Sequence, residues 1–287
     1  MSEVQWSDRL VEAIRAVGAP TCVGLDPVVE KLPRTVREQA GSPIEAIGRF
    51  CEGVIDACAG VCAAAKFQSA CFERYGGAGV TLLSSMIERA HHAGLAVVLD
   101  AKRGDIGVSA EHYAAGTKAL RAGAITVNGY LGPETIKPYL SAGLGVFVLV
   151  RTSNPDSDAV QSLKLADGRS VAEMMADHVA LLGATRIGKH GYSDVGAVVG
   201  ATKAEDGRAL RLRMPKQVFL VPGYGAQGGT ADDIKALLDG RLEHGGGVLV
   251  TASRSVIYAF EPGDAAWEKA VKRAAMKFGD EIRAVVA

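Results

Sequence analysis

The stretch "AVVLDAK" (residues 96–102) is a nearly continuous apolar run that ends in charged residues. Such a run is typical of a strand buried on both faces of a parallel sheet, whereas a strand with one solvent-exposed face alternates between apolar and polar residues. Seven further runs of this kind occur along the chain. They are "TCVGLD" (21–26), "AAAKFQ" (63–68), "AITVNG" (124–129), "VFVLVRTS" (146–153), "VGAVVGAT" (195–202), "QVFLVPG" (217–223) and "GVLVTAS" (247–253).

Helical patterns connect these runs. In "SPIEAIGRFCEGVIDACAG" (42–60), Ser42 is a candidate N-cap, Pro43 the first helical residue and Glu45 the partner in a capping box. Apolar residues recur at helical spacing in "GVTLLSSMIERAHHAGL" (79–95), "SAEHYAAGTKALRAG" (109–123), "TADDIKALLDGRL" (230–242) and "VAEMMADHVALLGA" (171–184).

Eight β-α units in roughly 250 residues predict an α/β protein with a (β/α)8 TIM barrel. We expect one domain over residues 1–287. The alternative is a doubly wound open sheet, because a count of strands does not prove that the sheet closes. One segment is irregular: "NPDSDAVQSLKLADGRS" (154–170) follows the fifth strand as a long insertion. Loops of this length are typically active-site lids or disordered segments.

The composition excludes several classes of protein. Lys plus Arg and Asp plus Glu both number 32, and no basic block is interleaved with aromatic residues, so we expect no nucleic-acid partner. No apolar stretch reaches the roughly 18 residues of a membrane span, and we expect a cytoplasmic protein. Five cysteines argue against a disulfide framework. Cys51, Cys58 and Cys62 share one helix face, which favours core packing over the alternative of a thiolate metal site.

Polar residues follow several of the predicted strands, at the end of a TIM barrel where catalytic residues lie. Asp100 and Lys102 are two residues apart on a strand, so both point to the same face and should form an ion pair. An isolated pair would be read as a structural salt bridge. Further polar groups at the same end instead indicate a reaction site, and these are Asp26, Lys66, Asp105, Thr152, Ser153, Asn154 and the segments "PGYGAQGG" (222–229), which begins with Pro222, and "TASRS" (251–255).

The segment "GYGAQG" (223–228) matches the G-x-G-x-x-G pattern of dinucleotide-binding proteins. That fingerprint belongs on the first β-α turn and needs an acid after the next strand, where this chain has Ser253 and Arg254. Glycines after strand seven and an arginine after strand eight instead fit the phosphate cradle of many TIM barrels. We therefore expect a monophosphate substrate, held by the Gln227 amide and the Arg254 guanidinium. A simple tight turn is the alternative, and it would leave Arg254 without a role.

Together, "LDAKRGDI" (99–106) with Ser109, "GLDP" (24–27), "TSNP" (152–155), "PGYGAQGG" and "SRSVIYA" (253–259) resemble the orotidine 5'-phosphate decarboxylase family, in its bacterial subgroup with longer chains. The resemblance implies a homodimer of TIM barrels that needs no cofactor and no metal. It implies decarboxylation of orotidine 5'-monophosphate to uridine 5'-monophosphate in de novo pyrimidine biosynthesis. Lys66, Asp100, Lys102 and the partner subunit's Asp105 would then form an alternating charge array, in which Lys102 stabilises and protonates the C6 carbanion.

The resemblance also implies the residues that bind the substrate. Asp26 would hold a ribose hydroxyl, Ser153 the pyrimidine, and Gln227 and Arg254 the phosphate. The substrate-binding set is completed by Pro222 and Ser253 and by Ile106 and Ser109, the last two contributed across the dimer interface. Ser253 departs from the family, in which a glycine usually precedes the arginine.

Two rival functions remain open. A sugar-phosphate aldolase or decarboxylase of the same superfamily would use the acids of the D-x-K-x-x-D element to hold Mg²⁺. A nucleotide-binding barrel without activity would keep the phosphate cradle and lose the charged residues, but Lys66, Asp100, Lys102 and Asp105 are all present.

Overall fold

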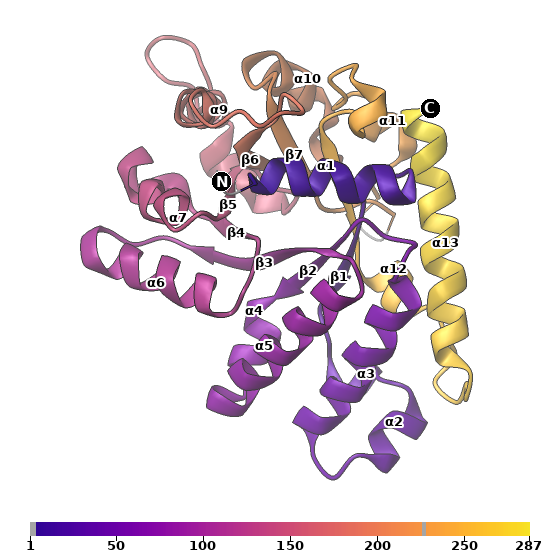
Figure 1. The fold of residues 1–287 in the computed structure, drawn as a ribbon. Coiled ribbons are helices and arrows are strands. Elements are labelled where there is room, and N and C mark those ends of the chain that lie inside the picture. The colour runs from indigo at the N-terminus through magenta and orange to yellow at the C-terminus, as the bar shows by residue number, and fades with distance from the viewer. Residues whose placement is uncertain (1–3, 226–227) are drawn as a thin grey trace.

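The computed structural model, which describes residues 4–225 and 228–287, is a closed barrel of eight parallel strands in sequence order (Figure 1). Each strand pairs with the next along the chain, and β8 pairs with β1. The predicted TIM barrel is therefore confirmed and the open sheet is excluded. The strands are β1 (Thr21–Leu25), β2 (Ala64–Gln68), β3 (Ala96–Arg103), β4 (Ala124–Val127), β5 (Gly145–Arg151), β6 (Ser193–Val199), β7 (Gln217–Val221) and β8 (Val248–Ala252).

All eight predicted strands are present, and six of them end one to three residues before the predicted end. The polar residues Asp26, Ser153, Pro222 and Ser253 therefore lie in the loops just beyond the strands rather than in them. This places them at the rim of the barrel, where a substrate can reach them.

Helices surround the barrel on its outer side (Figure 1). The α-helices are α1 (Trp6–Val17), α2 (Arg34–Gln39), α3 (Pro43–Cys58), α4 (Ser69–Glu73), α5 (Gly76–His92), α6 (Gly107–Ala119), α7 (Lys137–Ser141), α8 (Asp158–Gln161), α9 (Val171–Gly183), α10 (Ala204–Arg213), α11 (Ala231–Lys235), α12 (Arg254–Ile257) and α13 (Trp267–Val286). Short 3-10 helices are η1 (Val29–Lys31), η2 (Gly129–Leu131), η3 (Pro133–Ile136), η4 (Pro155–Ser157), η5 (Ala201–Lys203) and η6 (Leu242–His244). No helix within the described residues is both long enough and apolar enough to cross a membrane.

Two apolar clusters build the core. The larger cluster lies between the strands and the surrounding helices, and it contains the buried thiols of Cys51, Cys58 and Cys62, which confirms that these cysteines pack in the core. The second cluster fills the inside of the barrel and includes the apolar face of α1. The Trp6 and Phe147 rings meet edge to face at 5.3 Å. Helix α1 therefore closes the barrel at the amino ends of its strands and forms its floor.

Two local predictions differ from the structure. The Ser42 hydroxyl caps α3 by accepting the Glu45 N–H, as predicted. The Glu45 carboxylate accepts the Gly41 N–H at 2.8 Å instead of the Ser42 N–H, so the predicted capping box is wrong in this second bond. The helix predicted over 230–242 ends at Lys235. It ends there because the Leu237 and Leu238 amides donate to carbonyls three residues back, which tightens the chain into turns.

Candidate active site

A cavity of about 490 Å³ opens at the carboxyl ends of the strands, a size within the range of small-molecule sites. Every strand or the loop that follows it contributes to the lining. The lining brings together Asp26, Lys66, Asp100, Lys102, Thr152, Ser153, Asn154, Pro222, Ser253 and Arg254, all of which the sequence predicted at the site.

Asp100 lies between the two lysines of the cavity. Its Oδ2 is 3.0 Å from Lys66 Nζ and its Oδ1 is 2.6 Å from Lys102 Nζ, while Lys66 Nζ is also 3.4 Å from Asp26 Oδ1. Asp26, Lys66, Asp100 and Lys102 thus alternate in charge, and we call them the charge array. The Lys66 and Asp100 side chains are only 6% and 10% exposed, whereas that of Lys102 is 46% exposed. The array is therefore buried at its base and open at Lys102.

The buried part of the charge array is ionised. Burial favours the neutral acid at Asp100, but Lys66 and Lys102 outweigh it and lower the pKa of that carboxyl to about 2. Burial likewise opposes the charge on Lys66, yet Asp26 and Asp100 raise the pKa of its ammonium group well above the ordinary value. At neutral pH Asp100 and Lys66 are therefore both charged.

The predicted ion pair between Asp100 and Lys102 is confirmed, but regular strand alternation does not produce it. Lys102 has φ +46°, a conformation rare for a residue with a side chain, and the pairing of β3 with β4 shifts register next to it. The Lys102 N–H donates to Thr126 Oγ1 at 2.9 Å, and the Thr126 hydroxyl donates to Asp100 Oδ1 at 2.9 Å. Thr126 therefore links the strained backbone to the carboxylate that faces it.

The sequence did not single out Thr126, which lines the cavity, or Tyr258, which supports the lining from outside it. Tyr258 donates its hydroxyl hydrogen to the Asp26 carbonyl at 3.0 Å and accepts the Val28 N–H at 2.8 Å, so it fixes the loop after β1. Its ring stacks on Phe50 at 5.7 Å. The motif around Tyr258 was visible in the sequence, but its contact with a loop more than 200 residues earlier was not.

Ser253 fits beside Arg254 because of a glycine in the neighbouring strand. A Cβ atom at Gly24 would lie 1.9 Å from Ser253 Oγ, so only glycine leaves room for this hydroxyl. Arg254 begins α12 immediately afterwards and lines the cavity. The serine that departs from the family pattern is thus accommodated without displacing the arginine.

The loop after β7 uses its own amides. The N–H groups of Gly225, Gly228 and Gly229 donate to carbonyl oxygens within the loop. These three amides are therefore engaged within the loop. Gln227, the other predicted phosphate ligand, lies outside the described residues.

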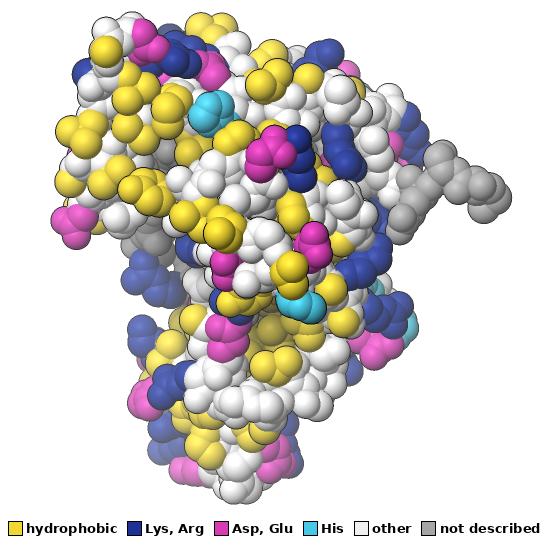
Figure 2. Space-filling view, turned by 90° about the vertical axis from the view of Figure 1, so that its left-hand side faces the viewer, with side chains coloured by type: hydrophobic (Ala, Val, Ile, Leu, Met, Phe, Trp, Pro, Cys, Tyr) yellow, Lys and Arg dark blue, Asp and Glu magenta, His cyan; other side chains and the backbone are white. Residues whose placement is uncertain are grey.

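Three predicted residues do not line the cavity of their own chain. Asp105, Ile106 and Ser109 lie at the start of α6, where Ile106 is 62% exposed and the Asp105 carboxylate accepts the Ile106 N–H at 2.8 Å. Val108 and Tyr113 are exposed apolar side chains of the same helix. Figure 2 views the side of the molecule that carries α6, α7 and α9, and hydrophobic side chains gather on its surface.

The acids of the D-x-K-x-x-D element do not converge. Both oxygens of Asp100 accept bonds from Lys66, Lys102 and Thr126, while Asp105 is turned to its own loop. Over the described parts of the chain, no three His, Cys, Asp or Glu side chains form a group that could hold a metal ion.

Comparison with known proteins agrees with this geometry. Residues 20–269 match the model of the orotidine 5'-phosphate decarboxylase / HUMPS family. Orotidine 5'-phosphate decarboxylase from Rhodopirellula baltica is 37% identical over 97% of this chain and 99% of its own length. The protein of the same name from Clostridium perfringens is 33% identical over 98% of this chain and 99% of its own. The structure of Leishmania donovani OMP decarboxylase superposes with a TM-score of 0.77 at 33% identity, covering 99% of both chains. This chain therefore belongs to the orotidine 5'-phosphate decarboxylase family.

Proposed function

We propose that this chain decarboxylates orotidine 5'-monophosphate to uridine 5'-monophosphate in de novo pyrimidine biosynthesis, as a single barrel domain over residues 1–287. One observation carries the proposal: a single ionised carboxylate, Asp100, bridges two lysines inside a cavity that can take a nucleotide. The full-length relatives with this activity in their names support it.

The reaction explains why such charges are needed. When the bond between C6 and the carboxyl group breaks, the electron pair stays on C6 in the plane of the ring, where the ring π system cannot delocalise it. A large rate enhancement then requires on the order of 20 kcal/mol of barrier lowering. An ammonium group about 4 Å from the carbanion supplies roughly 4 kcal/mol at an effective dielectric constant of 20, and more once water is excluded. Lys102 alone is therefore insufficient.

Within the charge array, each residue has a separate task. Lys102 is the most exposed member, so its ammonium group meets C6, stabilises the carbanion and donates the proton that replaces CO2. Asp100 holds that ammonium group in place through the 2.6 Å contact. Lys66, buried behind Asp100, keeps this carboxylate ionised and fixed. Solvent returns the proton to Lys102 after the product leaves.

Binding of the remote parts of the substrate supplies the rest of the barrier lowering. We assign the ribose hydroxyl to Asp26, the pyrimidine to Ser153 and the phosphate to Arg254, with Pro222 and Ser253 completing the lining. Gln227 belongs to the same proposal as a second phosphate ligand. No cofactor or metal takes part in these steps.

The proposal includes a homodimer in the cytoplasm. Asp105, Ile106 and Ser109 reach the site of the neighbouring subunit, where the partner subunit's Asp105 extends the charge array beyond Lys102. This is supported by the position of the three residues outside their own cavity and by the exposed apolar side chains of α6 beside them. A two-fold axis would give each site one such contribution.

The test is to incubate the purified protein with orotidine 5'-monophosphate and follow the loss of its absorbance, before and after exhaustive dialysis against EDTA. We expect the same rate in both samples, because the ammonium group of Lys102, and not a metal ion, meets the carbanion. Activity that disappears and is restored by Mg²⁺ would favour the aldolase-like alternative. Binding of the nucleotide without turnover would favour an inactive nucleotide-binding barrel.

A further inference from the structure

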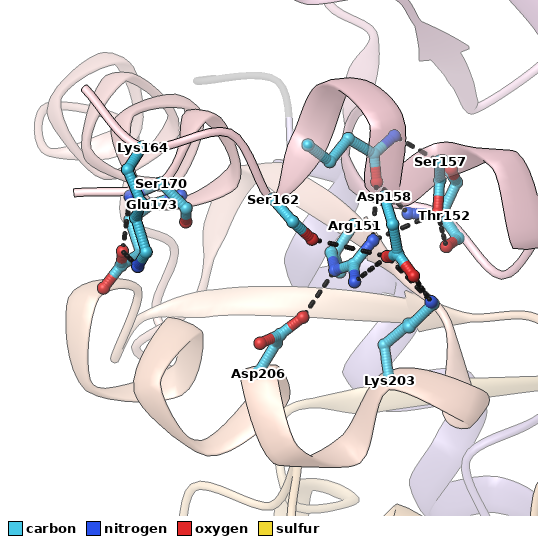
Figure 3. Close-up of polar contacts among 11 residues, drawn as sticks. Arg151, Thr152, Ser157, Asp158, Ser162, Lys164, Ser170, Glu173, Lys203 and Asp206 are labelled. Carbon is cyan, nitrogen blue, oxygen red and sulfur yellow. Dashed lines mark hydrogen bonds and ion pairs between the residues drawn. The ribbon is translucent and has the colours of Figure 1, made fainter. Parts of the chain in front are cut away.

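The last residue of β5, Arg151, is a buried cation that does not line the cavity (Figure 3). Its Nε donates to Asp206 Oδ2 at 2.6 Å, and its Nη1 donates to Ser157 Oγ at 3.0 Å. Its Nη2 donates to Asp158, and its Nη1 also lies 3.4 Å from Gln161 Oε1. One side chain therefore joins β5 to η4, α8 and α10.

A second cation strengthens this cluster. Lys203 Nζ lies 2.9 and 3.0 Å from the two Asp158 oxygens, and Lys203 and Arg151 lower the pKa of the Asp158 carboxyl to about 2. Burial disfavours the charge on Arg151, but Asp206 and Asp158 raise the pKa of its guanidinium. We call Arg151, Ser157, Asp158, Gln161, Lys203 and Asp206 the Arg151 network.

The Arg151 network is bonded directly to the cavity lining through Gln161. The Gln161 side chain accepts the Thr152 N–H at 2.9 Å and donates its amide hydrogen to Thr152 Oγ1 at 2.9 Å. The Thr152 hydroxyl in turn donates to Asn154 Oδ1 at 2.7 Å. Ser153 lies between these two bonded residues, and all four side chains line the cavity.

The end of β6 holds Ser153 from its other side. A Cβ atom at Gly200 would lie 2.9 Å from Ser153 Cβ, so the two backbones approach as closely as glycine permits. Behind the lining is a second cavity of about 230 Å³ between α8, α9 and α10, which Gln161 and Asp206 also line. The segment from Thr152 to Gln161 is thus a wall with a cavity on each side. Polar bonds, and not dense apolar packing, therefore set its position.

The insertion predicted over 154–170 thus has defined structure along its whole length. It contains η4 and α8, and Lys164 pairs with Ser170 in an isolated bridge. The charged contacts of Asp158 with Arg151 and Lys203 hold the first half of this insertion on the barrel.

We propose that Arg151 is a positioning residue that acts through Gln161 to hold Thr152, Ser153 and Asn154 in the geometry that receives the pyrimidine ring. The assignment of this end of the cavity to the pyrimidine rests on the proposed function. A preformed wall avoids the entropic cost of ordering a loop when the nucleotide binds. It therefore increases the affinity for the pyrimidine base of the nucleotide and not the affinity for its phosphate.

The test compares binding of uridine 5'-monophosphate with binding of ribose 5-phosphate, which lacks the base, by calorimetry. Gln161→Leu removes both bonds to Thr152, and Gln161→Glu keeps the acceptor for Arg151 and for the Thr152 N–H. We expect Gln161→Leu and Arg151→Lys to weaken binding of the nucleotide by about 5- to 10-fold, the effect of one or two neutral hydrogen bonds. Binding of ribose 5-phosphate should not change, and Gln161→Glu should restore most of the nucleotide affinity.

Arg213→Lys is the matched control. Arg213 forms a comparable ion-pair cluster with Asp177 and Glu173 on α9, but it does not line the substrate cavity, and its replacement should leave both affinities unchanged. The proposal is overturned if folded Gln161→Leu binds the nucleotide as the wild type does. It is also overturned if both ligands are weakened equally, because that pattern indicates general loosening of the barrel. If Arg151→Lys does not fold, the proposal is judged from the nucleotide affinities of Gln161→Leu and Gln161→Glu.

These measurements do not depend on turnover. A chain that fails to decarboxylate orotidine 5'-monophosphate but shows the selective loss of nucleotide affinity would contradict the proposed function and keep the positioning role. In an active enzyme, the same variants should raise KM more than they lower kcat.

Discussion

Replacement of Thr126 by valine removes a hydroxyl while keeping the size and shape of the side chain. This hydroxyl is buried, accepts the Lys102 N–H and donates to Asp100 Oδ1, both at 2.9 Å. The bond to the ionised Asp100 is worth about 1.5 to 3 kcal/mol. If the charge array shifts when that bond is lost, kcat/KM for orotidine 5'-monophosphate should fall about 10- to 150-fold. The free energy of unfolding should also decrease by about 1 to 3 kcal/mol, because the Lys102 amide then lacks an acceptor.

Steady-state kinetics and urea unfolding of the same preparation measure the two effects separately. Thr126→Ser is the control, since it keeps the hydroxyl and should retain most of the activity. The left-handed backbone at Lys102 makes the amide bond important, because without it the lysine can relax to a conformation in which its ammonium group no longer faces Asp100. A folded Thr126→Val enzyme with kcat/KM within twofold of the wild type would refute the positioning of Lys102 by Thr126.

Three further predictions test the substrate anchor, the dimer and the buried carboxylate. Arg254→Ala should lower kcat/KM for the phosphorylated substrate by about 3 kcal/mol and barely affect slow turnover of a substrate without the phosphate; equal losses on both would rule out a phosphate contact. Lys102→Ala and Asp105→Ala should each be nearly inactive, but after subunit exchange about a quarter of the wild-type activity should return, because about half of the dimers are hybrids with one intact site. Hybrid dimers that stay inactive would show that Asp105 acts in the active site of its own chain. The pKa of Asp100 is about 2 in the folded protein against an ordinary value of 3.8, so the unfolded state binds its proton first as the pH falls. Asp100 should therefore contribute on the order of 2 kcal/mol of stability above pH 4 to 5, which is lost towards pH 2, and urea unfolding of Asp100→Asn should show a correspondingly weaker decline from pH 5 to pH 3.

The barrel could be predicted from the sequence because each buried strand carries its own signal. A continuous apolar run such as 96–102 needs no knowledge of its neighbours, and eight such runs separated by helical patterns permit few architectures. The members of the charge array could be predicted for the same reason, since strand ends converge in a barrel. The geometry at Lys102 could not, because positive φ at a lysine depends on the register between β3 and β4.

Residues that act through distant contacts were missed. Thr126 appeared in the sequence only as a β-branched residue of a strand, and its role depends on lying beside Asp100 on the neighbouring strand of the barrel. In the sequence, Arg151 is simply the residue that follows an apolar run. Its hydrogen bond to Asp206, 55 positions later, is visible only in the folded chain. Helix length was also overestimated at α11, where apolar periodicity continues although the backbone turns.

The floor formed by α1 has a consequence for the order in which the chain folds. Its contacts lie far along the sequence: the Ser7 amide donates to Asp194, 187 residues later, and the Asp8 carboxylate accepts the amides of Lys189 and His190. At the ribosome's pace of about 5–20 residues per second, α1 waits roughly 10 to 40 s before these partners exist. During that interval the apolar face of α1 can meet only the inner residues of β1 to β5, such as Cys22, Val98 and Phe147, and it stays partly uncovered. The first helix to be synthesised therefore completes its contacts only after about two thirds of the chain has been made, and we expect nascent chains to be most prone to aggregation before β6 emerges.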